Sequence, residues 1–380
     1  MKSSLGRISA LVGLFMIIAS MLLTSILPVG LDRQPTSLPD QPTLDLTAPA
    51  VVFPTPDPDG PALEIAQVYI HPAGTFLLIQ PQGFTPSATS GSTVNSLSLV
   101  DGGRYSVIHA YIQEYSTPQD TTTLDAANDA AALAASWSEY DGWRETGRRI
   151  DADSVTIDFT LDLAGNTYLA RHITWVVPED PRLVCVVRLV APGNNAPLLD
   201  ALEALVRPSF HVLPDGLRAP LDWTAVVDPA AGYAIRYPAG WTLADGGPGR
   251  VVTTLTSAEG DTLTLSAVPG VLGAPADAET WLVERRPGVE TLDVQPVTRT
   301  YGDGYAIAYR FSDADGATHG GLALLLNTPG GQIISANLRL AGEAINLLDE
   351  DEASAYGDIW RMLDTFAPLP EDAVRAVTAG

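Results

Sequence analysis

A ten-residue stretch at 232–241 most constrains what this chain can fold into. It reads Gly-Tyr-Ala-Ile-Arg-Tyr-Pro-Ala-Gly-Trp, which is an alternating strand followed by a Pro–Gly turn and a tryptophan. A weaker copy lies at 75–84, and its Pro81 stands 157 positions before Pro238. One opening motif that occurs twice at this distance predicts that the chain contains a structural repeat.

The ends of the two copies support the repeat. Ser-Phe at 209–210 matches Thr-Phe at 365–366, an offset of 156 positions. Agreement at both ends predicts two domains of one fold, at 63–214 and 215–370, with a short tail at 371–380.

Strand patterns follow one another closely within each copy. Most of the connections are too short for a crossover helix, so mostly antiparallel pairing is expected. Helices are expected at 125–138 and 196–206 in the first copy, and at 276–285 and 352–366 in the second. The predicted class is therefore α+β, with each domain a mostly antiparallel sheet covered by helices. The expected strands are 75–80, 94–100, 105–114, 143–150, 155–161, 168–177 and 183–190, then 233–237, 251–256, 262–268, 294–301, 305–311, 322–327 and 333–340.

The second copy resembles the PsbP-like family, whose fold is shared with the Mog1 group. The resemblance rests on 232–241, on the strand-rich middle and on the closing segment Trp-Arg-Met-Leu-Asp-Thr-Phe at 360–366. It is weaker over 63–214, where Gln80 and Phe84 replace the usual Tyr and Trp. The resemblance implies two tandem α/β/α sandwiches. The family includes photosystem II subunits of the thylakoid lumen and bacterial extracytoplasmic proteins of unknown role, and no photosystem-binding motif carries over to this chain.

The N-terminal residues predict a membrane-spanning segment. Lys2 and Arg7 precede an apolar run at 8–27, which is long enough to cross a hydrocarbon core as a helix. We expect residues 1–30 to form a single-pass signal anchor with a cytoplasmic N-terminus. A cleaved signal peptide, which would release a secreted protein, is the alternative. The apolar positions expected to contact lipid are Ile8, Leu11, Leu14, Phe15, Ile17, Leu22 and Leu27.

Residues 31–62 are rich in proline and are expected to form an extended linker between the membrane and the folded domains, which would be extracytoplasmic. The whole chain has 45 acidic and 21 basic residues, a formal net charge of −24, which argues against nucleic acid as a partner. Cys185 is the only cysteine, so an internal disulfide is excluded, and its apolar surroundings predict a buried thiol.

No catalytic motif is apparent, and the five histidines lack partners at metal-ligand spacing. We therefore expect no enzyme, no catalytic residue, no cofactor and no metal site. Asp313 and Asp315 are weak metal candidates because they alternate before Gly316 as in a calcium loop. Leu322 stands where that loop requires a Glu, so a hairpin turn is favoured.

One group of aromatic and arginine residues suggests a binding surface, because exposed Trp, Tyr and Arg dominate protein interfaces. Under the alternative interpretation Trp137 packs beneath the sheet and the arginines pair with nearby acids. The residues of this predicted surface are Trp137, Tyr140, Trp143, Arg144 and Arg148.

Anchor, linker and paired domains together indicate a membrane-anchored, extracytoplasmic, non-enzymatic module that binds or assembles with an envelope protein. The alternative is a protein that binds a small ligand or calcium, between sheet and helix or between the two domains. The identity of the partner or ligand does not follow from the sequence.

Overall fold

The computed structural model describes residues 52–57, 63–245, 252–342 and 344–371. The expected anchor at 1–30, most of the linker and the end of the tail lie outside these residues. Within the described part of the chain, no helix is both long and apolar enough to span a membrane.

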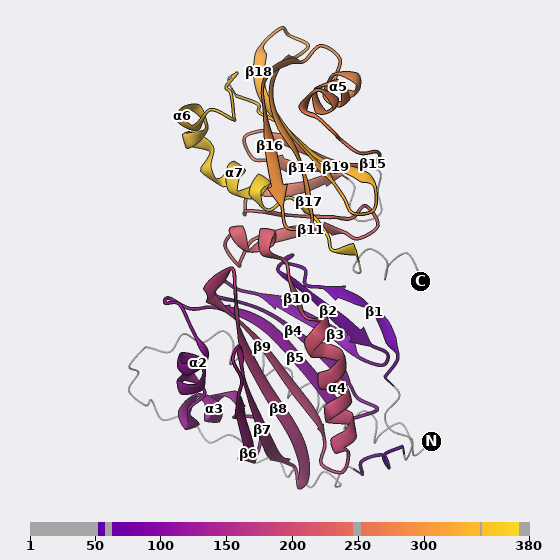
Figure 1. Cartoon of the computed structure of the whole chain (residues 1–380), viewed down its shortest axis with the longest axis vertical. Coiled ribbons are helices and arrows are strands. Elements are labelled where there is room, and N and C mark those ends of the chain that lie inside the picture. The colour runs from indigo at the N-terminus through magenta and orange to yellow at the C-terminus, as the bar shows by residue number, and fades with distance from the viewer. Residues whose placement is uncertain (1–51, 58–62, 246–251, 343, 372–380) are drawn as a thin grey trace, which may run out of the picture. The chain divides into compact units, whose positions relative to one another are not determined.

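The described residues form two compact units (Figure 1). Unit 1 contains the residues up to Ala66 together with Ile79–Ser209, and unit 2 contains Gln67–Leu78 together with the residues from Phe210 onward. This division places Gln67–Leu78 in unit 2, whereas the sequence analysis placed these positions in the first domain.

The main sheet of unit 1 has seven strands in the order β3-β4-β5-β9-β8-β7-β6, and all of its neighbours pair antiparallel. The first three strands form a meander, and the last strand returns to pair with the third. The bounds are β3 Thr85–Ser90, β4 Val94–Asp101, β5 Ser106–Glu114, β6 Gly142–Ile150, β7 Ser154–Leu163, β8 Asn166–Val177 and β9 Asp180–Pro192.

The main sheet of unit 2 has the order β13-β14-β15-β19-β18-β17-β16, again antiparallel throughout. The two units therefore share one topology, as the sequence repeat predicts. The bounds are β13 Trp241–Asp245, β14 Val252–Ser257, β15 Thr262–Pro269, β16 Glu290–Arg299, β17 Gly302–Ser312, β18 Thr318–Asn327 and β19 Gln332–Arg339.

Two three-stranded sheets, with the orders β1-β2-β10 and β11-β12-β20, complete the strands. The repeated opening motif forms the central strand of each small sheet, because β2 holds the first copy and β12 the second. The bounds are β1 Ile65–Ile70, β2 Phe76–Pro81, β10 His211–Val212, β11 Thr224–Asp228, β12 Tyr233–Tyr237 and β20 Ala367–Pro368.

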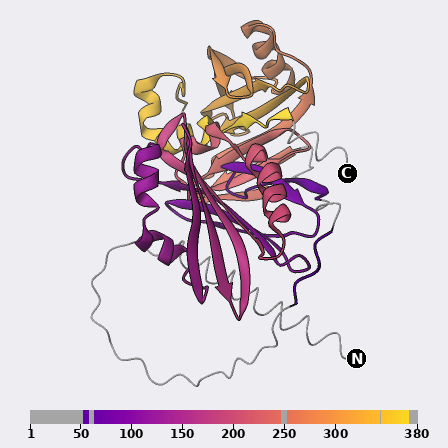
Figure 2. The same cartoon turned by 60° about the horizontal axis from the view of Figure 1, so that its bottom comes forward.

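Helices cover both faces of the unit 1 sheet (Figure 2). Helices α2 (Thr121–Ala127) and α3 (Ala130–Ser136) lie over one face and α4 (Ala196–Ser209) over the other. The single helix expected at 125–138 is wrong, because two caps divide it. The N–H of Asn128 closes α2, and the Asp129 carboxylate then accepts hydrogen bonds from the N–H groups of the first turn of α3.

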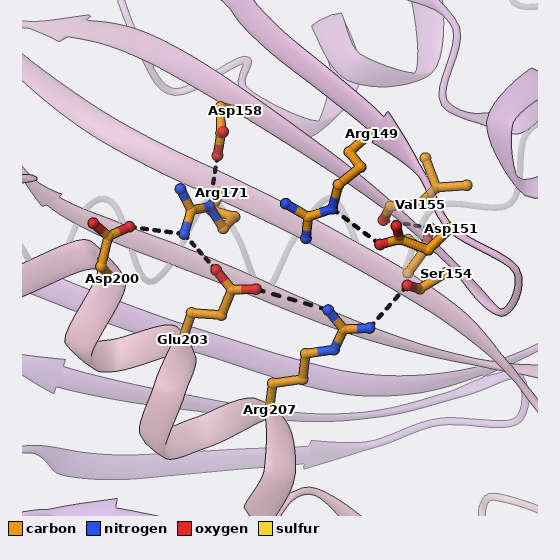
Figure 3. A network of polar contacts seen from close by, with 10 residues as sticks. Arg149, Asp151, Ser154, Val155, Asp158, Arg171, Asp200, Glu203 and Arg207 are labelled. Atoms are coloured by element: carbon orange, nitrogen blue, oxygen red, sulfur yellow. Dashed lines mark hydrogen bonds and ion pairs between the residues drawn. The ribbon is translucent and has the colours of Figure 1, made fainter.

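Helix α4 is fastened to its sheet face by buried leucines. It is also fastened by ion pairs (Figure 3). Arg171 of β8 pairs with Asp158 of β7 and with Asp200 and Glu203 of α4. Arg207 continues the network from Glu203 to the hydroxyl group of Ser154 at the start of β7. Every charge in this network has a partner, so we read it as structural.

Unit 2 is also covered on both faces. Helix α5 (Pro275–Arg285) packs over the face that carries Ile307 and Tyr309. The opposite face, which carries Ala306 and Ala308, is covered by α7 (Gly357–Asp364). The single helix expected at 352–366 is instead α6 (Glu350–Ala353), a 3₁₀ turn and α7, and the Asp349 carboxylate caps α6.

Candidate functional site

The main polar feature inside unit 1 is a row of side chains across three strands. Arg188 of β9 stands directly opposite His109 of β5 and His172 of β8. Directly opposed residues point to the same face of a sheet, and here that face is the one covered by α2 and α3. We call these three residues, with Tyr111, Ser136, Trp137 and Glu139, the Arg188 cluster.

Within the described part of the chain, the hydrogen bonds of Arg188 go to neutral groups. Its Nε donates to Nδ1 of His172 at 3.1 Å, and its Nη2 donates to the hydroxyl groups of Tyr111 and Ser136, both at 2.9 Å. Its guanidinium lies 5.4 Å from the ring centre of Tyr111 and 5.6 Å from that of Trp137. None of the described carboxylates forms an ion pair with Arg188, although the chain is strongly acidic.

Several buried polar atoms of the cluster lack a hydrogen-bond partner among the described residues. They are both ring nitrogens of His109, Nε2 of His172, the indole nitrogen of Trp137 and both carboxylate oxygens of Glu139. A buried polar group without a partner costs about 1–3 kcal/mol. Native proteins therefore rarely leave several such groups together unless water or a ligand completes them.

The electrostatics of the cluster hold both histidines neutral. Burial and the positive charge of Arg188 lower the pKa of His109 to about 3, and the same causes lower the pKa of His172 well below its ordinary value. Burial raises the pKa of Glu139. At neutral pH each imidazole can therefore donate one hydrogen bond and accept one, and neither has a pKa suited to general base catalysis near pH 7.

In the corresponding row of unit 2, no buried side-chain polar atom of the described residues lacks a hydrogen-bond partner. The Arg-Leu pair at 188–189 matches the pair at 339–340, and Arg339 stands opposite Thr262 and Gly321. Tyr309 fills the space beside Gly321, where an added Cβ would lie 2.3 Å from the Tyr309 ring. The Tyr309 hydroxyl lies 2.7 Å from Oδ1 of Asn337, so its polar atom is satisfied.

Only some residues of the predicted binding surface are exposed. Trp137 is fully buried and Tyr140 is 8% exposed, because both pack beneath α2 and α3 in the core. Their place in the predicted binding surface is therefore wrong, and the alternative interpretation, in which Trp137 is buried, is confirmed. Trp143 is half-buried against Phe159, and Arg148 pairs with acids as the alternative interpretation held. Arg144 is exposed.

The weak metal candidates lie in a hairpin turn. The Asp313 carboxylate accepts hydrogen bonds from the N–H groups of Asp315 and Ala317, and it lies 3.0 Å from Nε2 of His319. No group of three metal-binding side chains occurs in the residues that the structure describes. Cys185 is buried, and burial raises the pKa of its thiol.

Arg188 was not predicted as a site residue from the sequence, and the histidines were noted only as lacking partners at metal-ligand spacing. The sequence did contain one indication of a polar site, because Arg188 interrupts the apolar run at 183–190 that becomes the buried strand β9. A charge within such a run requires either an exit to solvent or polar partners.

No known protein family matches the sequence, and no curated protein does. The chain is similar to the solution structure of PsbP from the cyanobacterium Synechocystis, with 17% identity, a TM-score of 0.29, and coverage of 38% of this chain and 92% of that one. It is also similar to the Ran-binding protein Mog1p of Saccharomyces cerevisiae, with 12% identity, a TM-score of 0.30, and coverage of 40% and 96%.

A further similarity is to the immunity protein TplEi of Pseudomonas aeruginosa, with 14% identity, a TM-score of 0.22, and coverage of 81% of this chain and all of that one. The likeness to the PsbP and Mog1p structures is a distant similarity of fold over about two-fifths of the chain. Shared function does not follow from similarity of this kind.

Proposed function

We propose that the chain is a membrane-anchored, extracytoplasmic, non-enzymatic binding module whose first unit holds a small polar ligand at the Arg188 cluster. The N-terminal apolar run and the proline-rich linker support the anchor and the export of the folded units. The observation that carries the binding role is the set of buried polar atoms around Arg188 that have no hydrogen-bond partner among the described residues, whereas the corresponding Arg339 row in unit 2 has none.

The chemistry of the cluster restricts the ligand. Arg188 and the Trp137 indole offer donors. The neutral His109 ring offers one donor and one acceptor, whereas His172, whose Nδ1 already accepts from Arg188, offers only its Nε2 donor. The Glu139 carboxylate would repel a multiply charged anion. A neutral or zwitterionic polar molecule with a carbonyl or carboxylate oxygen fits these groups best.

The test is a thermal-shift screen of the full chain in detergent micelles. The probes are amino acids, neutral sugars and monocarboxylates at millimolar concentration. A bound ligand at about one hundred times its Kd stabilises the folded state by about 2.7 kcal/mol, which raises the melting temperature measurably.

The matched variants are Arg188→Lys and Arg339→Lys, which change equivalent positions in the two units. A shift that Arg188→Lys removes and Arg339→Lys keeps is the expected result. The proposal fails if no probe shifts the melting temperature, or if the shift persists in Arg188→Lys.

Assembly with an envelope protein is the second candidate. Trp143 and Arg144 are consecutive residues of the edge strand β6, so their side chains point to opposite faces of the sheet; Arg144 is exposed and Trp143 is half-buried. Capture of one envelope protein from solubilised membranes, lost on changing Arg144 to Ala, would support this role. Undiminished capture by the variant would contradict a role for this edge.

A further inference from the structure

A short piece of the proline-rich linker lies against unit 1. The ring of Phe53 meets the ring of Tyr168 edge-on, with centroids 5.0 Å apart, and lies 5.8 Å from the ring of Tyr105. Phe53 is half-buried, whereas the neighbouring Val52 is 86% exposed. The Phe53 side chain of the segment at 52–57 is therefore directed into a cradle formed by two aromatic rings.

A hydrogen bond also holds the backbone next to the Phe53 ring. Nδ2 of Asn194, in the loop between β9 and α4, donates to the carbonyl oxygen of Pro54 at 3.4 Å. The sequence from 53 to 58 is Phe-Pro-Thr-Pro-Asp-Pro, in which every second residue is proline. Such a sequence favours the polyproline II conformation, whose carbonyl groups are not used internally. Aromatic grooves with a side-chain donor to a carbonyl are the usual receptors for such peptides.

The backbone of Tyr105, one of the two tyrosines that contact Phe53, has an unusual conformation. Tyr105 has a φ of 52°, in the left-handed region that a tyrosine rarely occupies. Holding a bulky residue there costs about 1–3 kcal/mol, and such strain is concentrated at binding sites. The ring that is held in this way is one of the two that contact Phe53.

We propose that Tyr105, Tyr168 and Asn194 form a receptor for Phe-Pro-x-Pro segments of another protein, and that residues 52–57 occupy it as an internal competitor. The site is separate from the proposed ligand site at Arg188 and does not depend on it. Arg188→Lys is therefore expected to leave peptide binding unchanged.

The probe is a fluorescein-labelled peptide with the sequence of residues 49–58, PAVVFPTPDP, and its binding to the full chain in micelles is measured by anisotropy. A tethered competitor acts at about millimolar effective concentration. Removing it with Phe53→Ala is expected to tighten binding of the added peptide at least about tenfold.

Binding to the Phe53→Ala chain is then expected to fall about tenfold when Asn194, which is exposed and whose change should not affect folding, is replaced by Ala. Tyr168→Leu tests the ring contact in the same background, and a peptide with Ala in place of its Phe is the matched control. Equal binding of the two peptides would overturn the proposal. A wild-type dimer that Phe53→Ala abolishes would also overturn it, because a second copy would then be the occupant.

Discussion

At the scale of single residues, Arg236 joins an irregular segment to the repeated motif. It is fully buried, and its guanidinium donates to the carbonyl oxygens of Gly216 at 2.6 Å, Ala219 at 3.0 Å, Pro220 at 2.7 Å and Trp223 at 3.2 Å. Burial lowers the pKa of Arg236 to about 10, so the side chain stays charged at neutral pH. One charged side chain thus satisfies four carbonyl groups that the ladder of the small sheet does not.

Replacement of Arg236 by Met is expected to lower the free energy of unfolding by about 3 kcal/mol or more, because the four carbonyl groups would lose their donor in the interior. Urea denaturation followed by tryptophan fluorescence measures the change. Arg144→Met is the matched control, since Arg144 is exposed and should change stability by less than about 0.5 kcal/mol. Equal stability of the two variants would contradict this account of Arg236.

A second prediction at this scale concerns His319. The hydrogen bond to Asp313 and a contact of 2.8 Å with the carbonyl oxygen of Gly342 raise the pKa of His319 above its ordinary value of 6.5. A raised pKa in the folded state stabilises the fold below the unfolded pKa of about 6.5, and this contribution is lost as the pH rises through the folded value.

His319→Gln is therefore expected to remove part of the fall in stability between about pH 6 and pH 8. Melting temperatures measured across this range would show it. Asp313→Asn should have a similar effect, because it removes the partner that raises the pKa of His319. An unchanged pH slope in both variants would show that the pair does not couple to folding.

At the scale of elements, the contact between β17 and β18 depends on a glycine. A Cβ at Gly321 would lie 2.3 Å from Cζ of Tyr309, which is itself buried and hydrogen-bonded. Gly321→Ala is expected to destabilise the protein by about 1–3 kcal/mol, since the buried Tyr309 ring would have to move. Gly330→Ala is the matched control, because its nearest neighbour, Oγ1 of Thr328, would be 3.8 Å away. Urea denaturation compares the two, and equal losses of stability would contradict the steric explanation.

The sequence was informative about elements with a strong apolar pattern. The central strands were predicted to within about four residues, and the antiparallel class was confirmed. The edge strand β3 was missed because its sequence, Thr-Pro-Ser-Ala-Thr-Ser, has no large apolar residue and contains a proline. The helix at 125–138 was predicted as one piece because the capping role of Asp129 inside an alanine-rich run was not recognised.

The candidate site was harder to predict than the fold. His109, His172 and Arg188 become neighbours only through the pairing of β5 with β9 and of β9 with β8. That pairing joins positions up to 79 residues apart, and local patterns do not specify such a register. For Trp137 the sequence left both surface exposure and burial beneath the sheet open for the same reason, since its burial depends on a sheet face formed by distant strands.

At the scale of the whole molecule, net negative charge is expected to make stability depend on salt. A formal net charge of −24 makes the folded chain repel itself, and salt screens this repulsion, because the Debye length falls from about 30 Å at 0.01 M to about 10 Å at 0.1 M. The melting temperature is therefore expected to rise by several degrees between these concentrations of NaCl. KCl should produce the same rise. A larger rise with calcium at equal ionic strength would favour the calcium-binding alternative, and no rise with any salt would contradict the argument from charge.

The strand order of the two main sheets has a consequence for the timing of folding. The third strand of each main sheet pairs with the seventh. The inner edge of β5 therefore stays unpaired until β9 has been synthesised, and that of β15 until β19 has been synthesised. As each repeat emerges, its first three strands form a meander with an unpaired inner edge, which is open to wrong partners until the seventh strand arrives. Because both repeats present the same kind of edge, the β15 edge of the second repeat could capture β9 of the first. Slow release of the chain, one repeat at a time, would favour correct pairing.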